Sequence, residues 1–122
     1  KDTIIFELFV NWKKPIVLCE GAFDAIAIRL NAIPLLGKFP SKTLMKKILQ
    51  NNVSEIYIAL DSDAKIDSIK LAEKIISYGI KAYRLDLKDN DPSSLGFKRF
   101  WKLAKSSDEI KFSDIVKDRL YG

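Results

Sequence analysis

The sequence contains no histidine and a single cysteine among its 122 residues. Without histidine, the chain can form neither a Ser-His-Asp triad nor a site with a histidine general base. A tetrahedral zinc site built from cysteine and histidine ligands is excluded as well. One cysteine cannot form an intrachain disulfide. Any catalysis would therefore depend on carboxylates, lysines, hydroxyls or a metal ion that prefers oxygen ligands.

Long apolar runs are also missing, and no stretch approaches the ~20 residues that a membrane helix needs. Apolar residues make up 48% and charged residues 30% of the chain, which is typical of one folded domain. Asp2 and Glu7 interrupt any apolar stretch at the start, so no secretory signal is predicted and a cytoplasmic location is expected. Because the first residue is Lys1 rather than Met, we expect the chain to belong to a larger protein.

Positive charge exceeds negative charge, with 21 basic and 16 acidic residues and a net charge of +5. This balance suits a nucleic-acid or phosphate partner, although many other proteins share it. One late segment combines basic and aromatic residues: Phe97, Lys98, Arg99, Phe100, Trp101, Lys102 and Lys105. The segment could contact a single strand through phosphates and stacked bases. Alternatively, the aromatic residues anchor a helix while the basic residues face water.

Two periodicities alternate along the chain and predict strands separated by helices. The expected strands are residues 16–19, 33–36, 56–60 and 80–87. Helices are expected over 6–10, 22–31, 95–105 and around 113–120. Two more are expected between these, one after an N-cap at Ser41 and one that starts at Asp67 or Ser68 and ends before a C′ residue at Gly79. Pro92 is expected at the first position of a helix. This order predicts an α/β fold, with a parallel sheet of about four strands and helices on both faces.

Carboxylates follow three of the predicted strands, where functional sites of such sheets usually lie. Glu20 ends the first strand, Asp61 and Asp63 follow the third, and Asp89 and Asp91 follow the fourth. Two carboxylates about 4 Å apart repel by about 4 kcal/mol at an effective dielectric constant near 20, so such a cluster must bind protons or a cation. Oxygen ligands without histidine or cysteine favour Mg²⁺ or Mn²⁺ over zinc.

A structural role is the alternative for the two aspartates, because Asp is common at helix caps and in turns. Glu20 has no such advantage. Gly21 directly after it is expected to let the backbone turn tightly and expose the glutamate.

Four segments resemble, in order, motifs of the Toprim domain of bacterial- and phage-type DNA primases. Residues 15–25 contain an apolar strand, the pair Glu20 and Gly21, and a Phe-Asp-Ala triplet. Residues 36–37 match a short Leu-Gly segment, residues 58–63 an Asp-x-Asp motif, and residues 88–92 an Asp-Pro turn. The glutamate and the first aspartate of the Asp-x-Asp motif are 41 residues apart, and the resemblance covers residues 15–95.

The resemblance implies a Rossmann-like Toprim catalytic domain over residues 15–95, between a lead-in (1–14) and a helical extension (96–122). It implies metal-dependent nucleotidyl transfer that makes RNA primers on single-stranded DNA from nucleoside triphosphates, in a bacterial or phage-infected cell, with the replicative helicase as a further partner. Glu20, Asp61 and Asp63 would be catalytic, and the same residues with Asp91 would hold Mg²⁺ or Mn²⁺. Independently of the resemblance, Lys38, Lys42, Lys65 and Lys88 are candidates to contact nucleic acid or phosphate, with simple exposure to solvent as the alternative.

The chain departs from the primase pattern at several points. Ala64 and Lys65 follow the Asp-x-Asp motif, where an acidic residue and then Ala-Gly are usual. A complete primase also has a zinc-binding region and a basic polymerase subdomain, so this chain alone is expected to prime poorly. The alternatives are a Toprim nuclease, a topoisomerase fragment, a non-enzymatic receiver-like domain and an inactive nucleic-acid-binding relic.

Overall fold

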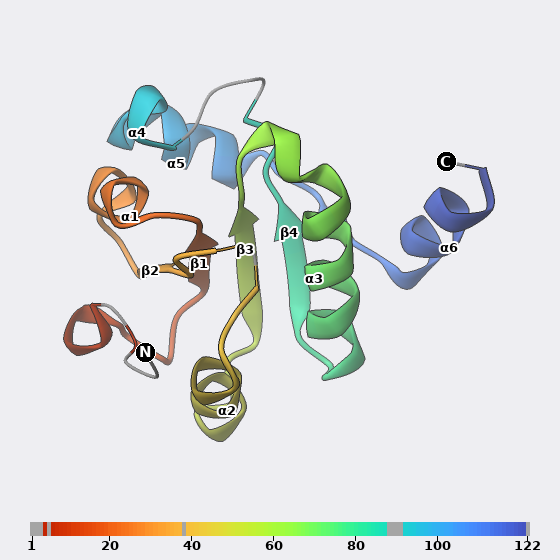
Figure 1. Cartoon of the computed structure of the whole chain (residues 1–122), viewed down its shortest axis with the longest axis horizontal. Helices are drawn as coiled ribbons and strands as arrows, with labels where there is room; N and C mark the ends of the chain where they lie inside the picture. Colours follow the sequence, from red (N-terminus) through yellow and green to blue (C-terminus); the bar gives the residue numbers. More distant parts are fainter. Residues whose placement is uncertain (1–3, 5, 38, 88–91, 122) are drawn as a thin grey trace.

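The apolar runs of the sequence form the centre of one twisted sheet (Figure 1). The computed structural model describes residues 4, 6–37, 39–87 and 92–121. The sheet has the order β2-β1-β3-β4-β5, in which the first four strands are parallel and β5 is antiparallel to β4. The strands are β1 (Ile16–Cys19), β2 (Ala32–Pro34), β3 (Glu55–Ala59), β4 (Lys81–Arg84) and β5 (Glu109–Ile110). The predicted α/β class is confirmed, and the fifth strand is an addition.

Helical segments connect these strands and cover both faces of the sheet. They are η1 (Glu7–Phe9), α1 (Ala22–Ile28), α2 (Lys42–Gln50), η2 (Ser62–Ala64), α3 (Lys65–Ser77), α4 (Pro92–Leu95), α5 (Phe97–Lys105) and α6 (Phe112–Tyr121). Two predicted helix ends are confirmed. The Ser41 hydroxyl accepts a hydrogen bond from the Leu44 N–H at 3.1 Å, and Gly79, with φ +80°, follows the last turn of α3.

Several predicted boundaries are wrong. Helix α3 begins at Lys65 rather than at an Asp67 or Ser68 cap, because the η2 turn runs directly into it. The helix expected over 95–105 is split at Gly96, whose φ of +78° separates α4 from α5. Strand β4 ends at Arg84 rather than at 87, although the next residue still donates its N–H to Ile58 at 3.0 Å.

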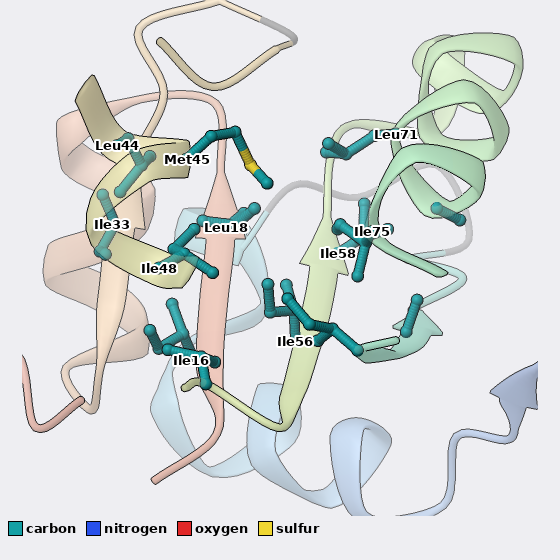
Figure 2. Close-up of a cluster of buried hydrophobic side chains, with 14 of the residues drawn as sticks. Ile16, Leu18, Ile33, Leu44, Met45, Ile48, Ile56, Ile58, Leu71 and Ile75 are labelled. Carbon is teal, nitrogen blue, oxygen red and sulfur yellow. The ribbon is translucent and has the colours of Figure 1, made fainter. Parts of the chain in front are cut away.

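Alternating strand residues divide the core into two layers, one on each face of the sheet. On one face, Ile16 and Leu18 pack beneath α2 and α3 (Figure 2). On the other face, Val17 and Cys19 pack against α1 and α5. All four strand residues have no exposed surface, since a parallel sheet between two helical layers is covered on both sides.

The aromatic residues of α5 anchor this helix rather than point into solvent. Phe100 is fully buried, and the Trp101 indole donates a hydrogen bond to the Ile28 carbonyl at 2.8 Å. The Arg29 guanidinium lies over the Phe97 ring, 4.9 Å from its centroid. The anchoring interpretation of the late aromatic segment is therefore correct.

Within the described ranges, no helix is long and apolar enough to cross a membrane.

Candidate metal centre

The carboxyl ends of β1 and β3 form the edge at which the predicted site residues lie. These strands pair in parallel, with Cys19 opposite Ala59. Glu20 is the first residue after β1, and Asp61 is the second residue after β3. Adjacent parallel strands therefore deliver both carboxylates to the same edge, as the sequence predicted.

Hydrogen bonds on two sides hold Glu20 in place. Its backbone carbonyl accepts the Leu36 N–H at 2.8 Å, which ties it to the loop after β2. Its side-chain Oε1 accepts the Asp61 N–H at 3.1 Å, which ties it to the end of β3. The glutamate side chain thus bridges the gap between the two strand ends, and the positions of Glu20 and Asp61 depend on each other.

The η2 turn brings a third carboxylate to the same place. One oxygen from each of Glu20, Asp61 and Asp63 lies within 4.8 Å of the others. The first two residues are half-buried and Asp63 is exposed, so the cluster is open to solvent on one side. Three carboxylates at this spacing repel one another unless a cation or protons compensate them. The donor set fits Mg²⁺ or Mn²⁺, which take oxygen ligands and retain open positions for water or phosphate.

The capping alternative does not account for Asp61. Asp61 occupies the N-cap position of η2, but its side chain makes no capping hydrogen bond to the described backbone of that turn.

The expected role of Gly21 is wrong. Its φ of −122° is open to any residue, and an added Cβ would meet only the Asp24 carboxylate at an ordinary 3.6 Å. The exposure of Glu20 therefore does not depend on a glycine at position 21.

Asp24 is a further carboxylate near this edge, and its position in the sequence was not predicted to have a role. Its Oδ2 accepts the Gly21 N–H at 3.2 Å, at the start of α1. The three-residue spacing from Gly21, typical of an acidic residue in the first turn of a helix, is the signal that could have identified it.

Cys19 lies beneath the cluster and is chemically inert. Burial raises the pKa of its thiol well above the usual range, and the nearby charges of Asp24, Asp61 and Glu20 raise this pKa further. The thiol group has no exposed surface and therefore remains protonated at neutral pH. Metal chemistry at this edge would depend on oxygen ligands alone.

The other predicted site residues are placed as follows. Lys65 is exposed at the first position of α3, directly after η2. Lys42 begins α2 and lines a shallow groove with Lys46 and Lys74 of α3. Lys38, Lys88 and Asp91 lie outside the described residues, so their proposed contacts remain predictions.

Comparison with known proteins identifies the type of fold. No protein-family model matches the chain, and no curated protein matches its sequence. Among solved structures, the fold is similar to a crystal structure of the Aquifex aeolicus primase that contains its zinc-binding and RNA polymerase domains. The TM-score is 0.68 and the sequence identity is 21%, over 88% of this chain and 29% of the primase chain. The likeness shows that this chain has a primase-like fold, and that it spans less than a third of the primase chain in that crystal structure.

Proposed function

We propose that this chain is the Toprim catalytic domain of a DNA primase, which joins nucleoside triphosphates into RNA primers on single-stranded DNA. The observation that carries the proposal is the cluster of Glu20, Asp61 and Asp63 at the carboxyl edge of a sheet with a primase-like fold. The order and spacing of the Toprim-like motifs support it independently.

The chemistry of the cluster is compatible with phosphoryl transfer, in which proteins mainly position groups and neutralise charge. Asp61 and Asp63 would hold Mg²⁺ or Mn²⁺, and Glu20 would either join them as a ligand or act as an acid–base group. When bound, the ion would neutralise the charge of the triphosphate and supply open coordination positions for its oxygens. The hydrogen bond from the Asp61 N–H to Glu20 would keep the glutamate at the strand ends during the reaction.

Nucleotide binding tests the site directly. We expect the chain to bind a fluorescent nucleoside triphosphate only when Mn²⁺ is present, because the carboxylates alone repel phosphate. Glu20→Gln should weaken this binding by about tenfold or more, since even outer-shell partners of a metal change its affinity by about 10–100-fold. Lys13→Gln, at an exposed position before β1, is the control and should bind as the wild type does. Nucleotide binding that persists in EDTA, or that is equally strong in Glu20→Gln, would contradict the proposal.

Primer synthesis by this chain alone is expected to be very low. The reaction must align a template and two nucleotides, and such positioning contributes as much as about 7–11 kcal/mol to lowering a barrier. A chain that spans 29% of the primase chain with the similar fold would provide only part of that framework. The assay incubates the chain and its Glu20→Gln variant with single-stranded DNA, nucleoside triphosphates and Mg²⁺ or Mn²⁺. Strong primer synthesis that depends on Glu20 would refute the prediction that this chain alone is insufficient, and would support the proposed metal site. Cleavage of the DNA that depends on Glu20 would favour a Toprim nuclease instead.

A further inference from the structure

Helix α5 presents a row of basic side chains to solvent. Lys98, Lys102 and Lys105 are spaced i, i+4 and i+7 and therefore lie on one side of the helix, with Arg99 flanking them. All four residues, here called the basic row, are exposed. The helix contains no acidic residue, and none of the four forms a salt bridge with any residue that the structure describes. The row is thus a patch of positive charge without ion pairs to the described residues.

A favourable effect on helix stability accounts for only two of the four basic residues. Lys102 and Lys105 lie in the last turn, where positive charge interacts favourably with the helix dipole. Lys98 and Arg99 lie in the first turn, where positive charge opposes the dipole and acidic residues are preferred. Like charges at i, i+3 and i, i+4 also repel. The first-turn pair therefore destabilises α5, which the buried Phe100 holds in place, and an anionic ligand would relieve that repulsion.

A pocket of about 360 Å³ opens beside the basic row. Its lining includes the apolar residues Leu87, Leu95 and Leu103, and the charged residues Arg99, Lys102 and Asp86. Phosphates would contact the charged part of this lining, where Arg99 and Lys102 outnumber the Asp86 carboxylate. The three leucines instead suit the flat, largely apolar surface of a nucleobase.

The pocket lies at the same edge of the sheet as the carboxylate cluster. Asp86 and Leu87 follow the carboxyl end of β4, which pairs in parallel with β3. Figure 1 shows α4 and α5 at the end of the molecule toward which β3 points. A nucleic-acid strand bound to α5 would therefore lie near the edge of the sheet at which Asp61 and Asp63 follow β3.

We propose that the basic row and the pocket together bind single-stranded DNA, with phosphates on the row and one unstacked base in the pocket. The row is about 10 Å long at a rise of 1.5 Å per residue, which corresponds to about two or three nucleotides. A single strand can place a base among the leucines, whereas a duplex keeps its bases stacked and paired. This inference rests on the proposed function, in which the bound strand is the template.

Anisotropy of a short labelled DNA single strand, measured in EDTA over a series of salt concentrations, tests the surface. Each phosphate contact to a single strand contributes about 0.7 to the slope of log K against log salt, or about fivefold in affinity at 0.1 M relative to 1 M salt. The Lys98→Gln/Arg99→Gln variant should therefore lower the slope by about 1.4 and weaken binding by about 25-fold at 0.1 M salt. The matched control is Lys13→Gln/Lys14→Gln, which removes the same charge at the opposite edge of the sheet and should retain at least half of the wild-type affinity.

Three outcomes would overturn the inference. These are wild-type affinity and slope in the α5 variant, equal losses in the α5 variant and the control, and binding of a duplex as tight as that of the single strand. The measurement is independent of the metal site, since EDTA removes divalent ions. If the α5 variant behaves as expected but Glu20→Gln retains metal-dependent nucleotide binding, the proposed function fails and the DNA-binding surface stands. If the nucleotide experiment succeeds and the α5 variant binds DNA normally, only the surface fails.

Discussion

Replacing Asp61 and Asp63 together by Asn is expected to abolish Mn²⁺ binding by this chain. The two residues supply two of the three carboxylate oxygens that lie within 4.8 Å of one another. Loss of a single outer-shell partner lowers metal affinity by about 10–100-fold, so loss of two direct ligands should exceed that range. Isothermal titration calorimetry with Mn²⁺ measures the effect. Wild-type binding should itself be weak, because phosphates normally complete the coordination shell.

The same substitution should leave the free energy of unfolding unchanged or slightly higher, because it removes like charges that repel in the folded state. Urea denaturation without metal tests this part. The control is Asp108→Asn/Glu109→Gln, which removes two negative charges beside and within β5, away from the cluster. Unchanged Mn²⁺ affinity in the Asp61/Asp63 variant, or an equal loss in the control, would rule out the candidate metal centre.

Phe100→Ala is expected to lower the free energy of unfolding by about 3–5 kcal/mol. Phe100 has no exposed surface and packs with Ala25 and Ile28 of α1 in the core layer beneath α5. Its ring also lies against Trp101, with 5.5 Å between the ring centroids. Because domains of this size are stable by about 5–15 kcal/mol, the loss would leave the fold marginal.

Urea denaturation of Phe100→Ala and of a control, Phe9→Ala, separates burial from residue type. The Phe9 side chain is 80% exposed on η1, so its loss should change stability by no more than about 0.5 kcal/mol. A decrease below about 1 kcal/mol for Phe100→Ala would show that α5 does not depend on this anchor.

The main features of the fold and the site could be predicted because they depend on strong local signals. Continuous apolar runs predict β1 and β3, and the parallel strand order predicts that Glu20 and Asp61 lie at one edge of the sheet. The hydrogen bond between the Asp61 N–H and Glu20 Oε1 could not be predicted, because this bond depends on the register of two strands that are distant in sequence.

The features that were missed depend on context rather than on local pattern. Strand β5 has two residues, too few for any periodicity, and exists because it pairs with Ala82 and Tyr83 of β4. Ser68 suggested a helix start, yet it is buried within α3 because the preceding η2 turn had already started the helix. Whether the aromatic residues of α5 anchor the helix or stack on nucleic-acid bases could be decided only once the core beneath the helix was known.

The hydrogen bond between the Asp61 N–H and the Glu20 side chain joins residues 41 positions apart, and these residues meet only when β1 and β3 pair. Neither segment alone contains all three carboxylates, so an unfolded chain has no equivalent site. Ion binding and folding at this edge would then be one linked equilibrium, and an ion at about 100 times its dissociation constant would add about 2.7 kcal/mol to stability. The reverse also holds: a substitution that loosens the β1–β3 pairing would lower ion affinity without touching a single ligand.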